Sequence, residues 1–392
     1  MKTRGLLRVD IIKQLYYKHP LSLTELSKLT QKSVPLVAKI VNELIDEGYV
    51  QEQGLAPSTG GRRASIFLLN PNKQRYVVSV ATDQFTARMI IYDLSNNIIH
   101  PIETLELALT EDFDAVDKLV SFIHENIEAS GIDKEKLLGV GIGMPGFIIA
   151  EEGVNHSHLK TNDGTQLGKY LTEKLKLPVF IENDSRLIAL AEFYFGAAVG
   201  RKDVMVVNIG WGTGLGIIVN GQLYKGSGGY AGEFSHIPLS NTNILCSCGK
   251  RGCLEVETSL LVMTRRAKAE IEAGAATSMT ELFKDKSRNT GELFLEAARN
   301  HDPLAVSILS EAAFHIGKGM ATLIHIMNPE CIVLSGRGAM AGKIILPPIQ
   351  QAINEFCIPR IADQTSVILS ELAADAELLA GASLVVEHSQ FN

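Results

Sequence analysis

The sequence predicts an α/β protein with a small helical head at its N-terminus and a larger body of two α/β lobes. Three observations carry this prediction. The first 70 residues show apolar residues at helical spacing and then two short strand segments. The rest of the chain has the order strand, strand, strand, helix, strand, helix twice. Residues 1–75 hold 12 Lys and Arg against 6 Asp and Glu, whereas residues 76–392 hold 25 against 38. A basic head on an acidic body indicates that the head meets a polyanion.

Apolar residues at helical spacing predict three helices in the head. The first helix is expected to end near His19, just before a proline. Ser22 and Glu25 have the spacing of a capping box, so the second helix should begin there. The third helix follows a short turn, and Gly48 is expected to end it as the C-terminal capping residue.

A β-hairpin follows the helices, formed by residues 49–52 and 65–69 around a connection rich in glycine and arginine. Three helices with such a hairpin form a winged helix-turn-helix, whose third helix enters the DNA major groove. We therefore assign residues 1–70 to a DNA-binding domain. The positions expected nearest the DNA are Gln31, Lys32, Ser33, Pro35, Lys39, Arg62 and Arg63. The alternative is a small helical domain that binds protein through a solvated basic surface.

Residues 71–75 are predicted to be a linker, and the two lobes follow at 76–198 and 199–374. The first lobe should be joined by a C-terminal helix over 375–392, and we expect a ligand cleft between the lobes. We find no apolar stretch long enough to span a bilayer and no signal-peptide pattern. Free thiols clustered for a metal indicate a reducing compartment. These features predict a soluble, cytoplasmic protein without membrane insertion.

Three of the five cysteines, Cys246, Cys248 and Cys253, fall within eight residues, and His236 lies ten positions ahead of the first. One imidazole and three thiolates make a closed tetrahedral ligand set, which is typical of a structural zinc site. Because this set leaves no open position for an activated water, a zinc-dependent enzyme is disfavoured. The alternatives for the cysteines are small buried apolar side chains or a disulfide pair.

The body carries four motifs with defined spacing, one of which contains the three clustered cysteines. They are Glu182-Asn183-Asp184, Gly210-x-Gly212-Thr213-Gly214, Gly232-Glu233-x-x-His236 and Cys246-x-Cys248-Gly249-x-x-Gly252-Cys253-x-Glu255. With these motifs, head and body together resemble the ROK family (repressors, open reading frames and kinases), in particular its transcriptional repressor branch. The resemblance covers nearly the whole chain and implies an actin-like sugar-kinase fold for the body.

The resemblance also implies a sugar site in which His236 contacts the sugar and binds zinc at once. The implied sugar contacts are Asn183, Asp184, Glu233, His236 and Glu255. Carboxylates and amides suit this role because each can bind two adjacent hydroxyl groups. The alternative for residues 182–184 is an ordinary helix cap.

Kinases of this fold need a hairpin of the form Asp-x-Gly-Gly-Thr, whose glycines let backbone amides approach the ATP phosphates. In the matching stretch, residues 81–87, the glycine positions hold Gln84 and Phe85 in one alignment and Phe85 and Thr86 in the other. We therefore expect no catalytic residue, and Asp184 is the position of a general base without a phosphoryl donor. The glycine-rich residues 210–216 and 335–338 are intact, which tight turns explain as well as nucleotide binding does.

Together these observations predict a sugar-responsive repressor of carbohydrate metabolism genes. A homodimer or tetramer would present its winged heads to double-stranded operator DNA, and a sugar or sugar phosphate in the body would change their spacing. A sugar-transport protein can carry the signal in place of a small ligand, as the resemblance implies. The alternative is an ATP-dependent sugar kinase with a DNA-binding appendage.

Overall fold

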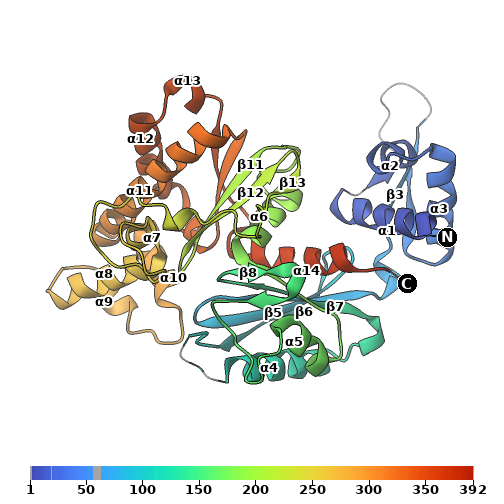
Figure 1. Ribbon diagram of the computed structural model, residues 1–392, viewed down its shortest axis with the longest axis horizontal. Coiled ribbons are helices and arrows are strands. Elements are labelled where there is room, and N and C mark those ends of the chain that lie inside the picture. The colour runs from blue at the N-terminus through green and yellow to red at the C-terminus, as the bar shows by residue number, and fades with distance from the viewer. Residues whose placement is uncertain (1, 19, 56–62, 111, 113, 392) are drawn as a thin grey trace. The chain divides into compact units, whose positions relative to one another are not determined.

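The computed structural model describes residues 2–18, 20–55, 63–110, 112 and 114–391 (Figure 1). The chain divides into two compact units, each of which has most of its contacts within itself. The first comprises Met1–Gly146, Ala150–Glu182 and Leu378–Asn392, and the second comprises Phe147–Ile149 and Asn183–Glu377. This division reflects packing alone, so the domain limits drawn from the sequence stay a prediction.

The head contributes three helices and a small sheet to the first unit. Its elements are α1 (Lys2–Tyr17), β1 (Leu21–Ser22), α2 (Leu23–Thr30), α3 (Val34–Asp46), β2 (Val50–Leu55) and β3 (Ser65–Leu69). The predicted capping box is present, because Ser22 Oγ accepts from the Glu25 N–H at 3.3 Å and Glu25 Oε2 accepts from the Ser22 N–H at 2.8 Å. Gly48 follows α3 with φ +78°, as its predicted capping role requires. The predicted helix end at His19 lies outside the described residues.

The hairpin of the head carries one strand more than the sequence predicts. The order of its sheet is β1-β3-β2, in which Leu21 pairs with Phe67 and Ser22 with Ile66. A two-residue strand is too short to show an alternating pattern, and only the pairing with β3 reveals it.

A five-stranded sheet forms the rest of the first unit, with the order β10-β7-β4-β5-β6. Its strands are β4 (Tyr76–Thr82), β5 (Thr86–Asp93), β6 (Ile98–Glu106), β7 (Leu137–Met144) and β10 (Val179–Asn183), and the short β8 (Ile148–Ile149) and β9 (Val154–Asn155) follow β7 in the chain. Helices α4 (Ala115–Ala129) and α5 (Leu167–Leu175) cover one face and α14 (Ala376–His388) the other (Figure 1). Helix α14 lies close to β7 because both carry glycine: a Cβ on Gly141 would stand 2.0 Å from the Gly381 carbonyl oxygen.

The second unit contains a sheet with the same strand plan, in the order β13-β12-β11-β14-β15. Its strands are β11 (Val204–Ile209), β12 (Thr213–Val219), β13 (Gln222–Leu223), β14 (Cys331–Ser335) and β15 (Ser366–Leu369). In both sheets three antiparallel strands are joined to a strand that runs parallel to the first of them, β4 with β7 and β11 with β14. The predicted duplication of the body is therefore confirmed.

Eight helices among the described residues complete the second unit. They are α6 (Asp184–Phe195), α7 (Glu255–Thr258), α8 (Leu260–Glu272), α9 (Met279–Leu282), α10 (Thr290–Arg299), α11 (Pro303–Met327), α12 (Leu346–Phe356) and α13 (Pro359–Ala362). A large apolar core gathers along α11, whose Ile316 and Met320 are fully buried and belong to one cluster with Val207 of β11. This core supports the sheet edge at which the candidate site lies.

Within the first unit, the C-terminal residues pack against the head. Phe391 is only 2 % exposed, and its ring meets that of Tyr49 edge-on with 6.3 Å between centroids. Arg8 Nη2 donates to the Phe391 carbonyl oxygen at 3.2 Å, and Lys13 Nζ pairs with Glu387 Oε2 at 3.1 Å. The end of α14 thus connects the head to the rest of this unit.

Replacing the buried ring of Phe391 tests this connection. We expect Phe391→Ala to lower the free energy of unfolding by about 2–4 kcal/mol, because it removes apolar contacts and leaves a cavity. Urea unfolding measures the change. The control is Phe356→Ala, at a side chain on a residue that is 40 % exposed, for which we expect a loss below about 1 kcal/mol. Equal losses in the two variants would contradict the packing role of Phe391.

Candidate functional site

The four predicted metal ligands meet in the second unit. The ligand atoms of His236, Cys246, Cys248 and Cys253 all lie within 4.8 Å of one another, and Cys246 and Cys253 are buried. His236 Nδ1 is 3.6 Å from Cys246 Sγ, and Cys248 Sγ is 3.6 Å from Cys253 Sγ. A tetrahedral zinc site with Zn–S bonds of about 2.3 Å would place its sulfur atoms roughly 3.8 Å apart. The cluster can therefore hold a metal ion of this kind.

A disulfide pair, one of the alternatives for these cysteines, does not fit the geometry. All five cysteines, which lie among the described residues, are free thiols. A separation of 3.6 Å between Cys248 Sγ and Cys253 Sγ is far longer than a disulfide bond of about 2.05 Å. Burial, together with the neighbouring thiols, raises the pKa of Cys253 to about 12, so a cation is needed to hold this thiolate at neutral pH.

Glycines shape the loop that carries the thiols. Gly249 and Gly252 have φ of +82° and +80°, in the left-handed region that side chains other than glycine rarely adopt. The Gly249 N–H donates to the Cys246 carbonyl at 2.9 Å, and the Cys246 N–H donates to the Lys250 carbonyl at 2.8 Å. This tight turn directs Cys246 and Cys248 to the same point, which explains the Cys-x-Cys-Gly spacing.

The imidazole of His236 connects the thiol cluster to the predicted sugar-binding residues. Its Nδ1 faces Cys246, and its Nε2 lies 3.9 Å from Glu233 Oε2. Burial lowers the pKa of His236, which favours the neutral imidazole that a metal ligand requires. A metal bound at Nδ1 would leave the proton on Nε2 and direct it toward Glu233.

Three carboxylates of the second unit interact electrostatically, and one of them, Glu233, lies beside His236. Burial raises the pKa of Glu233, with the nearby charges of Arg186 lowering it and Asp184 raising it. Burial also raises the pKa of Glu255, although it accepts a hydrogen bond from the Thr213 N–H at 3.0 Å. The Asp184 charge acts on both glutamates, so all three carboxyl groups belong to one electrostatic site. Such a set of hydrogen-bonding oxygens suits a polyhydroxyl ligand.

Helix α6 begins inside this site, and its first residues are held in place by hydrogen bonds. Asn183 Oδ1 caps the helix by accepting from the N–H groups of Ser185 and Arg186 at 3.1 and 3.2 Å. Asp184 Oδ1 accepts from the Ser185 N–H at 2.7 Å, and Asp184 Oδ2 is 3.4 Å from Asn208 Nδ2. The helix-cap interpretation therefore holds for the Asn183 oxygen, while Asp184 lies among the carboxylates.

Two polar residues of the site were not predicted from the sequence. Arg186 is 4 % exposed and donates from Nη1 to the Gly229 carbonyl at 2.6 Å and from Nη2 to the Ile148 carbonyl at 3.0 Å. Asn208 is buried at the end of β11 and contacts the start of α6 through Asp184. Backbone carbonyl partners leave no pattern in a sequence, so spacing could not have identified Arg186.

The hairpin that would serve ATP phosphates in a kinase is closed by its own aspartate. Asp83 Oδ1 accepts from the N–H groups of Phe85 and Thr86, each at 2.8 Å, and Asp83 Oδ2 accepts from the Thr86 hydroxyl at 2.9 Å. The carbonyls of Gln84 and Phe85 accept from the backbone of Leu109 and Leu107. This turn is built around side chains larger than glycine.

The predicted DNA-contacting positions lie on the surface of the head. Gln31, Lys32, Ser33, Pro35, Lys39 and Arg63 are all exposed. Arg62 lies outside the described residues. Val34 and Leu36 are exposed as well, at 40 % each, so the start of α3 presents apolar and polar groups together.

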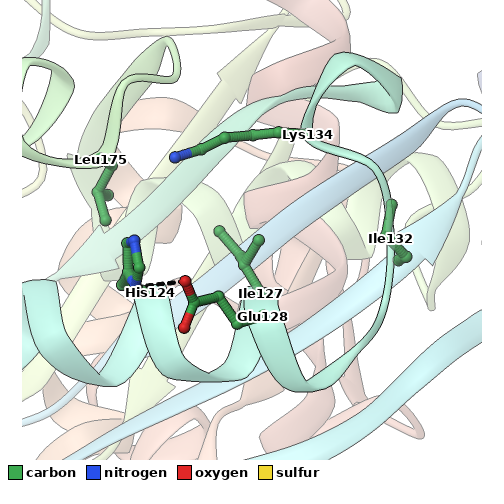
Figure 2. Close-up of a pocket in the computed structure, with 6 residues that line it drawn as sticks. All are labelled: His124, Ile127, Glu128, Ile132, Lys134 and Leu175. Atoms are coloured by element: carbon green, nitrogen blue, oxygen red, sulfur yellow. Dashed lines mark ion pairs between the residues drawn. The ribbon is translucent and has the colours of Figure 1, made fainter.

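A separate pocket of about 130 Å³ opens on the first unit (Figure 2). Its lining residues are His124, Ile127, Glu128, Ile132, Lys134 and Leu175, and His124 Nδ1 faces Glu128 Oε1 at 3.6 Å. None of the predicted site residues lines it, and its volume is below the range of typical small-molecule sites.

In the part of the chain that the structure describes, none of the helices has the length and apolar character needed to span a membrane.

The duplicated sheets and the carboxylate site define a protein of the actin-like, sugar-kinase type with a His/Cys cluster that can hold a metal. The sequence matches the ROK family over residues 86–388, and the chain belongs to this family. It is 29 % identical to the DNA-binding transcriptional dual regulator NagC of Escherichia coli, over 98 % of this chain and 95 % of that protein. It is 33 % identical to a glucokinase of Halalkalibacterium halodurans, over 71 % of this chain and 83 % of that protein.

A solved structure is also similar along the whole chain. It is a ROK family transcriptional regulator, described as a homolog of the Escherichia coli MLC protein, with a TM-score of 0.78 and 25 % identity. The match covers 99 % of this chain and 96 % of that one. The family resemblance drawn from the sequence motifs is therefore confirmed.

The two hydrogen bonds of Arg186 generate a prediction about the residue 226–232 loop. Arg186→Met keeps the bulk of the side chain but leaves the carbonyls of Gly229 and Ile148 without these donors, at a cost of roughly 2–4 kcal/mol in the free energy of unfolding. Hydrogen exchange of the loop amides should become faster. Arg288→Met, at an exposed ion pair with Glu296, is the control and should change little. Unchanged exchange in Arg186→Met would show that the loop does not depend on this side chain.

Proposed function

We propose that this chain is a sugar-responsive transcriptional repressor whose head binds operator DNA. The main support for the proposal is how much of this chain each relative matches. The bacterial regulator matches 98 % of this chain, whereas the glucokinase matches 71 %. A head of three helices and a hairpin has the composition of a winged helix-turn-helix, and its exposed α3 start supplies polar, basic and apolar groups for the major groove.

The sugar effector binds at the start of α6 in this proposal. Asp184, Glu233, Glu255 and the Nε2–H of His236 take the hydroxyl groups, and Asn183 fixes the helix start that carries Asp184. The metal is a structural zinc, because three thiolates and one imidazole close its tetrahedral shell. It orients the imidazole of His236, so that metal and sugar sites share one side chain.

The protein acts without phosphoryl transfer in this proposal. Three donors of its own turn engage the Asp83 carboxylate, and Phe85 stands where a phosphate loop needs glycine. The second glycine-rich segment has a packing reason of its own: a Cβ on Gly214 would lie 1.9 Å from Ser185 Oγ. Intact glycines there do not require a nucleotide.

Repression and release follow from a difference in affinity. The sugar must bind more tightly to the conformation that does not bind DNA, and a coupling of about 1–3 kcal/mol shifts operator affinity roughly 5- to 150-fold. A homodimer presents two heads to a pseudo-palindromic operator, so a change in their spacing weakens both contacts at once. A sugar-transport protein that binds the same conformation would act in the same way.

Fluorescence anisotropy with DNA flanking the gene of this protein tests the proposal. We expect salt-sensitive, sequence-selective binding that one member of a panel of neutral and phosphorylated sugars reverses. Asp184→Ala should keep the operator affinity within about twofold and lose the release by sugar, since the substitution removes a ligand contact and leaves the head unchanged. The exposed Asp285→Ala is the control. Release of the Asp184→Ala variant at the wild-type sugar concentration would contradict the assigned pocket, and failure to bind any DNA selectively would contradict the repressor.

The zinc assignment has its own test. We expect purified protein to contain about one zinc ion per chain by elemental analysis, and Cys248→Ser to lose most of it. The same variant should need more sugar for release, because His236 loses its orientation. Cys357→Ser changes a buried thiol outside the cluster and should keep the zinc. Full zinc content in Cys248→Ser would exclude Cys248 as a ligand.

A further inference from the structure

Phe147 stands beside His236 and contacts Tyr230, and neither aromatic side chain has a part in the function described so far. The ring of Phe147 lies 6.5 Å from the imidazole of His236, tilted by 32°. The ring of Tyr230 meets that of Phe147 edge-on, with 5.9 Å between centroids. Phe147 is 38 % exposed and Tyr230 41 %, so both residues remain partly open to solvent.

Both rings are carried by backbone that Arg186 fixes. The guanidinium donates to the carbonyls of Ile148 and Gly229, and these residues directly follow Phe147 and directly precede Tyr230. Gly232, which ends the loop of Tyr230, has φ +101°, and a Cβ there would stand 2.3 Å from the Leu215 carbonyl oxygen. One buried cation therefore holds two segments, far apart in the chain, so that their aromatic side chains meet.

A pyranose ring offers two kinds of surface to such a site. Its hydroxyl groups lie around the rim and need polar partners, whereas its faces present C–H groups when the hydroxyls are equatorial. Carboxylates and an imidazole supply the first kind of partner, and an aromatic face supplies the second. The polar groups around His236 would bind the hydroxyl groups of a sugar, and the aromatic ring of Phe147 beside it would contact the C–H face.

We propose that Phe147 and Tyr230 form an aromatic wall that packs on the C–H face of the bound sugar and selects pyranoses whose hydroxyls on that face are equatorial. This inference rests on the proposed sugar site and adds a requirement on the ligand, a pyranose whose hydroxyl groups on the packed face are equatorial. An epimer with an axial hydroxyl on the packed face would hold the ring away from the wall. D-allose carries that group on one face of the glucose ring and D-galactose on the other.

The test measures binding of D-glucose, N-acetyl-D-glucosamine, D-xylose, D-allose and D-galactose to the full chain by calorimetry. Trp211, the single tryptophan of the chain, neighbours the Gly212-Thr213 segment at Glu255 and gives a second, fluorescence signal. We expect Phe147→Leu and Tyr230→Leu to weaken binding of the preferred sugar about 2- to 10-fold, from an aromatic contribution of about 0.5–1.5 kcal/mol. The preference for that sugar over D-allose or D-galactose should shrink in the same variants.

Conservative variants and a distant control make the result decisive. Phe147→Tyr keeps the ring and should bind like the wild type, which separates loss of stacking from loss of folding. Phe356→Leu alters an equally exposed aromatic residue of the second unit and should have no effect. Wild-type affinity and epimer preference in Phe147→Leu and Tyr230→Leu, with binding lost in Glu233→Gln, would overturn the aromatic wall and leave the sugar site standing. Absence of sugar binding by the wild type would overturn both.

Discussion

The contact between helix α6 and strand β12 is the constraint on which the site depends. A Cβ on Gly216 would lie 2.6 Å from the Ser185 carbonyl oxygen, and one on Gly214 would lie 1.9 Å from Ser185 Oγ. Only a strand without side chains at these positions lets the helix approach so closely. The helix start then places Asp184 among the carboxylates and directs Arg186 to the carbonyls of two other segments. A side chain at Gly214 or Gly216 would displace both groups together.

The second constraint is the imidazole of His236, which belongs to two environments. Its Nδ1 faces the thiol cluster and its Nε2 faces Glu233, so one ring connects the candidate metal cluster to the carboxylates. Partial desolvation raises the pKa of both Glu233 and Glu255, and the charge of Asp184 raises it further. Holding these carboxylates near Asp184 is unfavourable for folding, and such sites are commonly kept for ligand binding. A ligand with several hydroxyl groups would relieve this cost by donating hydrogen bonds to them.

Sequence reasoning succeeded where the determining contacts are local or follow a repeat. The capping box of Ser22 and Glu25 spans three residues, and the thiol ligands span eight, so their spacing alone carries the geometry. The duplicated strand order could be predicted because the central strands β4, β5, β7 and β11 are mainly apolar segments of six to eight residues. Asn183 shows the limit, since its Oδ1 caps the helix in the structure while the sugar contact predicted for the same residue stays a prediction.

Contacts between distant segments could not be predicted in this way. Arg186 binds backbone carbonyls 38 and 43 residues away, and any residue type supplies such an acceptor. The same physical reasoning separates the two glycine-rich segments of the body. Glycine at 214 and 216 is required by helix packing whatever the protein binds, so its presence says nothing about ATP. The first hairpin has no such packing constraint, and there Asp83 has become the cap of its own turn. The turn of that hairpin therefore supports the proposal that the body binds sugar without phosphorylating it.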